Sequence, residues 1–164
     1  MARKGTTTNQ TPATGAPLLP ATAKLTRVLR YWMLRSGEAV VLAQFSGPGI
    51  TGSNNTLLYR VAFNGTETLL LRSGSNAPDC GNAKIGAISR VEVNPDTGDY
   101  LALTTLSGSE SSANQALWAG RSSLFDSNPR LLLRKGALLR VDGVNSAVAS
   151  MSLVLPQSTT GAGG

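Results

Sequence analysis

Residues that could do chemistry are scarce in this sequence. The 164-residue chain contains no histidine, so it lacks the commonest general base and the commonest zinc and iron ligand. Its one cysteine, Cys80, lies in the turn-rich stretch "NAPDCGNAK" and has no histidine to help form a thiolate. No serine stands in a Gly-x-Ser-x-Gly nucleophile elbow. We therefore expect no enzymatic activity, no catalytic residue and no cofactor, and we interpret Cys80 as a bystander thiol.

One turn carries the only candidate metal ligands. Asn94, Asp96 and Asp99 in "NPDTGD" offer oxygen atoms at nearly alternating positions, as calcium loops do. Two carboxylates and one amide are too few to hold calcium alone, and Pro, Asp and Gly are turn formers in their own right. A plain turn is our main interpretation, with a weak calcium site as the alternative. The glycine-rich stretch 46–53 lacks the spacing of a dinucleotide or phosphate loop and is predicted to be a loop.

Two arginines recur in nearly identical hexamers. "LLLRSG" covers residues 69–74 and "LLLRKG" covers residues 131–136, which places Arg72 and Arg134 at equivalent positions. They could form an anion-binding ring on one face of a propeller. Alternatively, they could form a salt bridge or donate hydrogen bonds to carbonyl groups of a neighbouring blade, since a guanidinium group satisfies several acceptors. Recurrence in both copies favours the structural interpretation.

The hexamers belong to a longer internal repeat. "EAVVLAQFSG" from Glu38 matches "DYLALTTLSG" from Asp99 at a spacing of about 61 residues. "NTLLY" and "NQALW" match at a slightly shorter spacing, and Ile88 and Val91 match Met151 and Val154 at a slightly longer one. The drift falls in loops, where insertions are tolerated. The sequence therefore predicts two adjacent copies of one unit.

Each unit is predicted to contain four short strands, because apolar residues alternate in runs separated by turn formers. The expected strands are 38–45, 56–63, 69–74 and 85–93 in the first unit, and 99–106, 115–122, 131–136 and 147–155 in the second. Four antiparallel strands repeated radially describe β-propeller blades. We predict an all-β fold with about two four-stranded antiparallel propeller-type blades and partial blades at both ends. The predicted divisions are a disordered arm at 1–14, a remnant unit at 15–36, units at 37–97 and 98–160, and the start of a third at 161–164.

The positive charge of the chain is concentrated near its start. Six of the 15 basic residues precede Glu38, the first acidic residue, and the other nine balance the nine acidic residues. A basic arm can bind nucleic acid or anionic lipid, but the first twenty residues lack aromatic side chains for base stacking, which favours a solvated arm. The segment 25–34, "LTRVLRYWML", fits either a basic amphipathic helix or a strand, and we favour the strand because Val, Tyr and Trp suit one. The chain shows neither a secretory signal nor a membrane-spanning run.

Three stretches resemble a known family: "RSGSNAPDCG", "NPDTGDYLALTTLSG" and "ANQALWAG" are similar to the tandem-repeat β-propellers of large bacterial exported proteins, many of which carry a C-terminal sorting anchor. The matching residues are Arg72, Gly74, Ala77, Pro78, Asn94, Gly98, Leu106, Leu117 and Trp118. The chain departs from the pattern in one extra turn residue before Gly98, and in Ser75 and Ala137 where an aspartate is expected. The resemblance covers residues 15–164 and implies a non-enzymatic role outside the cell or at its surface.

The sequence therefore predicts a non-catalytic structural or binding repeat module, as a fragment of an exported propeller protein. The alternative is part of a carbohydrate-binding or carbohydrate-acting propeller whose site lies on missing blades, and a weaker one is a nucleic-acid binder that uses the basic arm. The expected partners are further copies of the chain or further blades of a longer one. We identify no small-molecule ligand, and we expect neither nucleic acid nor membrane as a partner.

Overall fold

The described part of the chain is all-β. The computed structural model describes residues 10–11, 19–20, 22–122 and 129–154. Its strands are β1 (Gln10–Thr11), β2 (Lys24–Met33), β3 (Ala39–Ser46), β4 (Thr56–Val61), β5 (Glu67–Arg72), β6 (Lys84–Val93), β7 (Tyr100–Ser107), β8 (Gln115–Gly120), β9 (Arg130–Arg134), β10 (Leu138–Val141) and β11 (Val144–Ala147). The one helical element among these residues is a 3-10 turn, Ser111–Ala113. The predicted all-β class is confirmed.

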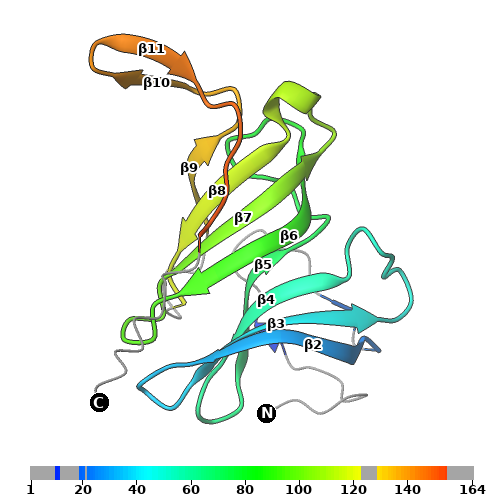
Figure 1. Cartoon of the computed structure of the whole chain (residues 1–164). Coiled ribbons are helices and arrows are strands. Elements are labelled where there is room, and N and C mark those ends of the chain that lie inside the picture. Colours follow the sequence, from blue (N-terminus) through cyan, green and yellow to red (C-terminus); the bar gives the residue numbers. More distant parts are fainter. Residues whose placement is uncertain (1–9, 12–18, 21, 123–128, 155–164) are drawn as a thin grey trace, which may run out of the picture.

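The strands form two main sheets and a hairpin (Figure 1). The first sheet has the order β1-β5-β4-β3-β2, in which β1 pairs with β5 in parallel and every other pair is antiparallel. The second sheet has the order β6-β7-β8-β9 and is entirely antiparallel. The hairpin of β10 and β11 projects beyond β9 (Figure 1). Both main sheets therefore contain a four-stranded meander in which each strand pairs with the next one in sequence.

The two meanders also share their irregularities. Register shifts occur at two points in the pairing of β2 with β3, and at two corresponding points in the pairing of β6 with β7. In the first sheet, Leu70 has no partner residue on β4, because its neighbours on either side pair with adjacent residues of that strand. Leu132 is bypassed by β8 in the same way. Each leucine triplet thus contains a β-bulge at its middle residue, and such an extra residue bends the strand and increases its twist.

The grouping of strands into sheets differs from the expected one. Residues 85–93 were predicted to close the first unit, but β6 pairs with β7 and opens the second sheet. The first sheet instead begins with β2, so the helical alternative for residues 25–34 is wrong and the strand is confirmed. The physical reason is the short connection between β6 and β7, which is closed by a hydrogen bond from the Asn94 amide to the Asp99 carbonyl (2.8 Å).

The strand predicted at residues 147–155 is not formed as such. Ala147 ends β11, and residues 148–154 have no strand partner among the described residues. The unit boundaries proposed from the sequence stay predictions. Residues 161–164 and most of residues 1–14 lie outside the described part of the chain.

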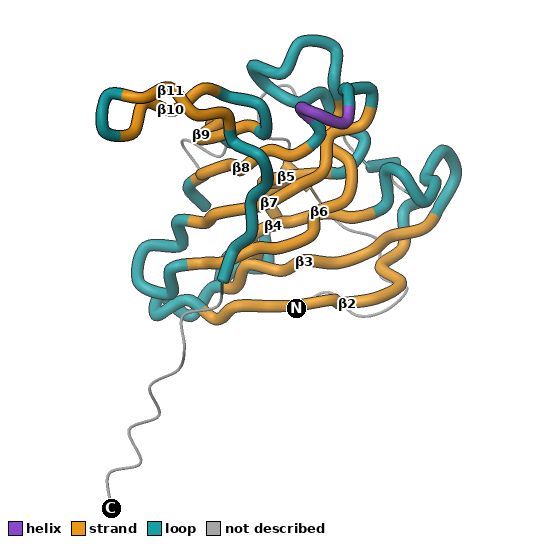
Figure 2. The backbone as a smooth tube through the Cα atoms, turned by 45° about the horizontal axis from the view of Figure 1, so that its top comes forward, coloured by secondary structure: helices purple, strands orange, loops and turns teal. Residues whose placement is uncertain are grey.

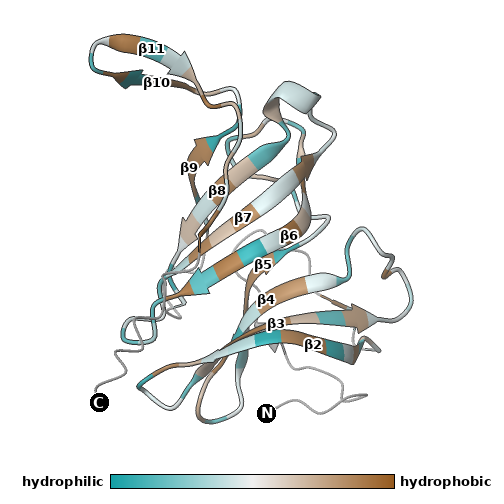
Figure 3. Ribbon diagram, in the orientation of Figure 1, coloured by the Kyte–Doolittle hydropathy of each residue, from teal (hydrophilic) through white to brown (hydrophobic). Residues whose placement is uncertain are grey.

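Two apolar clusters hold the first sheet from both sides. One cluster lies between the two sheets, and its buried members are Leu34, Val40, Leu42, Leu58, Leu70, Leu71, Ala77, Cys80, Ala83, Ile85, Val91, Tyr100, Ala102, Leu106, Ala116 and Trp118. The other cluster lies on the far face of the first sheet and contains Leu19, Ala23, Leu25, Val41, Ala43, Phe45, Leu57, Tyr59, Val61 and Leu69. Figure 2 shows the stacked strands, and Figure 3 shows apolar segments on the strands of both sheets and on the projecting hairpin. Strands β3, β4 and β5 of the first sheet are consequently buried on both faces, whereas the edge strand β2 is mostly exposed.

Candidate functional site

The recurring arginines brace loops within their own sheets. The Arg72 Nε donates a hydrogen bond to the carbonyl of Asn54 (3.1 Å), and the Arg134 Nε donates to the carbonyl of Ala113 (3.1 Å). Each acceptor lies two residues before the third strand of its meander, β4 or β8. Arg134 also donates to the Ser109 hydroxyl (3.1 Å). Burial lowers the pKa of Arg72. These contacts favour the structural interpretation over an anion-binding ring, but these acceptors lie beside the arginine's own sheet and not on a neighbouring blade as predicted.

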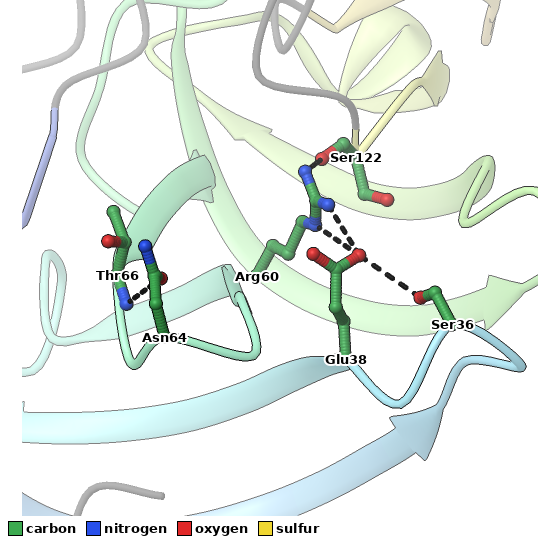
Figure 4. A network of polar contacts seen from close by, with 6 residues as sticks. All are labelled: Ser36, Glu38, Arg60, Asn64, Thr66 and Ser122. Carbon is green, nitrogen blue, oxygen red and sulfur yellow. Dashed lines mark hydrogen bonds and ion pairs between the residues drawn. The ribbon is translucent and has the colours of Figure 1, made fainter.

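Another arginine, Arg60, connects the two sheets (Figure 4). Glu38 lies just before β3, and its Oε2 accepts hydrogen bonds from the Arg60 Nε (3.1 Å) and Nη2 and from the Ser36 hydroxyl (3.1 Å). The Arg60 Nη1 donates to the carbonyl of Ser122 (2.9 Å), which lies two residues after Gly120, the last residue of β8. The hydrogen bond from Arg60 is the main reason that the pKa of Glu38 lies below its usual range, since burial acts in the opposite direction. The ion pair lies within the first sheet, and the hydrogen bond from Arg60 to Ser122 connects that sheet to the segment that follows β8.

The predicted calcium ligands form a braced turn. The Asn94 Oδ1 accepts a hydrogen bond from the Asp96 amide (2.9 Å), and the Thr97 hydroxyl accepts one from the Asp99 amide (3.2 Å). Asp96 forms an ion pair with Arg35, and Asp99 lies 4.0 Å from Arg121. Two carboxylates that face arginines favour the plain-turn interpretation. In the described residues, no group of three or more His, Cys, Asp or Glu side chains could hold a metal ion.

A cavity of about 590 Å³ lies beside this turn at one end of the second sheet. Asn94 and Asp99 line it, whereas Asp96 is not among its lining residues. The other lining residues are Glu92, Val93, Tyr100, Leu101, Ala119, Gly120, Arg121 and Arg130. The cavity therefore combines hydrogen-bond acceptors on carboxylates with donors on arginines beside an apolar wall. That mixture can bind a polar, uncharged ligand.

Glu67 is the main titratable residue that the sequence did not single out. It opens β5, is 5% exposed, and its Oε2 has no hydrogen-bond partner among the described residues. Burial raises the pKa of Glu67 to about 7. Burial, together with the nearby Glu67 carboxylate, also raises the pKa of Tyr59. Both residues lie away from the cavity at the end of the second sheet, so they add no chemistry to it.

Cys80 lies in the loop between the sheets and belongs to the inter-sheet cluster. It is 5% exposed, and burial raises the pKa of its thiol. A buried thiol with a raised pKa has little thiolate at neutral pH, which favours the interpretation as a bystander. The described residues include no helix long and apolar enough to span a membrane.

One sequence signal could have indicated the ion pair between Arg60 and Glu38. Arg60 is the only charged residue within the apolar run "TLLYRV", and a charge in a buried strand requires a partner. The identity of that partner depends on the packing, because Glu38 precedes Arg60 by 22 residues. Glu67 gave no signal, since a glutamate at the start of a strand is ordinary.

Comparison with known proteins gives a family but no activity. No curated protein and no solved structure matches the chain. A family model described as "Family of unknown function (DUF7453)" matches residues 2–162. Because the match covers nearly the whole sequence, the chain belongs to DUF7453, a family of unknown function.

Proposed function

We propose that this chain is a non-catalytic structural or binding repeat module, and that its two meanders are propeller-type blades. The observation that carries the proposal is the way in which the sheets stack. The first sheet contributes Val40, Leu42 and Leu58 to the inter-sheet cluster. The residues at the equivalent positions of the second sheet are Leu101, Leu103 and Leu117, and none of them belongs to that cluster.

The second sheet contributes a different set of residues to the same cluster. Tyr100, Ala102 and Trp118 pack against the first sheet. Their equivalents in the first sheet are Ala39, Val41 and Tyr59, which pack in or against the cluster on its far face. Each sheet therefore has two distinct faces, and unlike faces meet. Head-to-tail stacking of this kind can continue from one repeat to the next, as it does in propellers and other repeat proteins.

The remaining parts of the proposal rest on composition and resemblance. The absence of histidine and of a nucleophile elbow supports a non-enzymatic role. The similarity to repeats of exported bacterial propellers supports a place outside the cell or at its surface. Bound partners are then expected to be further blades or further copies of the chain.

The proposal is tested by asking whether the two sheets unfold together. Ala102 is fully buried between the sheets, whereas Thr105 on the same strand is exposed. Ala102→Asp should accelerate amide exchange in β3 and β4 as well as in β7 and β8, because a charge in the interface destabilises both sheets. Thr105→Asp is the matched control and should leave both sheets protected. If Ala102→Asp deprotects only the second sheet, the sheets do not form one stacked unit.

A second candidate function follows from the cavity at the end of the second sheet. Carbohydrate hydroxyl groups require both acceptors and donors, and the cavity supplies Glu92 and Asp99 together with Arg121 and Arg130. Titration of the protein with neutral oligosaccharides, followed by NMR, would shift the Asp99 and Arg121 amides if sugars bind there. Arg121→Gln should then remove the shifts. An unchanged spectrum at millimolar oligosaccharide would eliminate this candidate.

A further inference from the structure

The segment after the hairpin repeats the backbone contacts of β6. In the first copy, the Gly74 amide donates to the carbonyl of Ile85 (2.7 Å), and the Ile85 amide donates to the carbonyl of Ser75 (2.8 Å). In the second copy, the Gly136 amide donates to the carbonyl of Val148 (2.8 Å), and the Val148 amide donates to the carbonyl of Ala137 (2.9 Å). Val148 therefore occupies the place of Ile85, which is the second residue of β6.

The intervening loops correspond as well. An antiparallel bridge between Asn76 and Lys84 closes the loop that precedes β6. The pair of Leu138 and Ala147 closes the hairpin of β10 and β11 at the corresponding point. The hairpin is thus the second copy of the inter-sheet loop, so the chain that leaves it should enter the first strand of another sheet.

Residues 148–154 follow the course expected of such a strand. The segment runs along the second sheet in both Figure 1 and Figure 2. The Met151 amide donates a hydrogen bond to the Gln115 side chain on β8 (3.2 Å), and Met151 and Leu153 are half-buried. Met151 corresponds in sequence to Ile88, which is half-buried against the inter-sheet cluster.

The solvent exposure of equivalent residues shows that residues 148–154 and the far face of the second sheet are not covered by a neighbouring sheet in the described part of the chain. Leu70 is 2% exposed where the second sheet covers it, whereas its equivalent Leu132 is 54% exposed. Val91 is 2% exposed in β6, whereas its equivalent Val154 is 80% exposed. The hairpin shows the same contrast, since its large apolar residues Leu138, Leu139, Val141 and Val144 are all exposed, whereas Ala77, Cys80 and Ala83 in the inter-sheet loop are buried. The exposed positions are the ones that a third sheet would cover.

We propose that residues 148–154 are the first strand of a third sheet, an inference that rests on the proposed function. The far face of the second sheet, together with the hairpin, is then a docking surface for the three strands that complete it. The partner is a three-stranded antiparallel meander of the same repeat, with the residue pattern of β7 to β9. Its docking face is uncharged, because the face that the second sheet turns toward the first carries Tyr100, Ala102, Ala116 and Trp118.

The proposal is tested by supplying those strands. The full chain is extended at its C-terminus by a second copy of residues 100–134, and amide exchange is measured for residues 148–154. We expect exchange at these amides to slow at least tenfold relative to the parent chain, because they acquire a strand partner. The matched control carries Ala102→Asp and Trp118→Asp in the appended copy only, which removes its apolar face, and should not slow exchange.

The outcomes separate this proposal from the one on which it rests. Unchanged exchange at residues 148–154, with both existing sheets still protected, overturns the third sheet and leaves the stacked module intact. Independent unfolding of the two sheets in the parent chain would instead remove the proposed function itself. If the parent chain forms a dimer by light scattering in which residues 148–154 become protected, the occupant is a second copy and the proposed partner is wrong.

A second probe keeps the test available if the extended chain does not fold. A fluorescent peptide of residues 98–108, which contains β7, is titrated with the parent chain. A rise in anisotropy that is abolished by Met151→Pro supports the proposal, since proline at the centre of the segment restricts its backbone and is poorly tolerated inside a paired strand. No binding at millimolar concentration of the chain counts against it.

Discussion

The two sheets share one strand plan but differ in how deeply they are buried. All six residues of β5 are buried, whereas every residue of its counterpart β9 is exposed or half-buried. The difference does not lie in the local sequence, because both strands contain three leucines, a bulge at the middle leucine and an arginine that braces a loop. It arises because β3 to β5 of the first sheet are covered on both faces, whereas the second sheet is covered on one.

This contrast separates two contributions to stability. Strand formation, bulges and loop bracing are encoded within each repeat and recur wherever its residues recur. Burial of the leucines is supplied by the neighbouring sheet, so it depends on the position of the repeat in the stack. In repeat proteins, such interface terms add to the intrinsic stability of each unit. The comparison therefore predicts that equivalent substitutions have unequal costs when they remove stacking contacts, and equal costs when they remove local ones.

The largest expected difference is between Leu70→Ala and Leu132→Ala. Leu70 is 2% exposed and lies in the inter-sheet cluster, so its truncation should lower the free energy of unfolding by about 3 kcal/mol. Leu132 is 54% exposed, and the same truncation should cost less than about 1 kcal/mol. Urea unfolding followed by circular dichroism measures both. Equal losses would show that the two sheets are buried alike in solution.

The strands could largely be predicted from the sequence, but their grouping could not. Alternation of apolar residues identified the strands of both meanders, and the two hexamers revealed that one plan is used twice. Alternation does not say which neighbouring strand a strand will join. The decisive clue was a match between "KLTRVLRYWM" and "KIGAISRVEV". In this alignment Lys24, Leu25 and Arg30 are equivalent to Lys84, Ile85 and Arg90. The basic character of the first segment obscured it.

The site residues also divide into those that the sequence could predict and those that it could not. The structural role of Arg72 and Arg134 was accessible, because it was indicated by their recurrence in both copies. Their acceptors were not, since the sequence suggested a neighbouring blade and the structure places them beside the same sheet. The ion pair of Glu38 with Arg60 and the buried carboxyl of Glu67 were not accessible. Their environment depends on how distant segments pack. At the equivalent positions of the second sheet, Ala119 replaces Arg60 and Pro129 replaces Glu67, whereas Glu38 is matched by the acidic Asp99.

A second contrast concerns two ion pairs of unequal burial. The side chains of Arg60 and Glu38 are 13% and 17% exposed, whereas those of Arg90 and Glu92 on the second sheet are 30% and 27% exposed. Arg60→Gln should lower the free energy of unfolding by about 2 kcal/mol, because it leaves the Glu38 carboxylate and the Ser122 carbonyl without a charged donor. Arg90→Gln, as the matched control, should cost less than about 1 kcal/mol. Equal costs would mean that the contacts of Arg60 with Glu38 and Ser122 are no stronger than a surface ion pair.

The same pair gives a pH dependence of defined sign. The pKa of Glu38 is lowered in the folded chain, so its contribution to stability is present above its ordinary pKa of 4.5 and is lost as the pH falls through the lowered value. Glu38→Gln should therefore weaken the chain at pH 7 and reduce its loss of stability on acidification. Thermal unfolding midpoints between pH 3 and pH 7 measure the effect. A fall in the unfolding midpoint from pH 7 to pH 3 as large as that of the parent chain would contradict this expectation.

Local contacts should instead have matched costs in the two sheets. Gly74 and Gly136 both have positive φ angles, of 80° and 84°. An added Cβ would lie 2.6 Å from the Asn54 side chain at the first position and 2.8 Å from the Ser112 carbonyl at the second. Gly74→Ala and Gly136→Ala should each destabilise the chain by about 1–2 kcal/mol, because both changes combine left-handed backbone strain with a close contact. A difference as large as that between the two leucine variants would show that these turns also depend on stacking.

The smallest effect concerns Glu67, and it is a gain in stability. The pKa of this buried carboxyl rises from 4.5 to about 7 on folding, so its protonated form is favoured in the native state. Its contribution is fully present below about pH 4.5, is lost as the pH rises to about 7, and stays lost at higher pH. Glu67→Gln keeps the shape and removes the charge, so it should raise the free energy of unfolding at pH 8 by about 1 kcal/mol and leave it nearly unchanged at pH 4. Urea titrations at the two pH values measure the difference, and Glu38→Gln provides the opposite control because its effect grows toward neutral pH as a loss. A Glu67→Gln variant that is less stable than the parent at pH 8 would show that the carboxylate has a hydrogen-bond or charged partner in solution. It would also show that water reaches this face of the first sheet despite its apolar cluster.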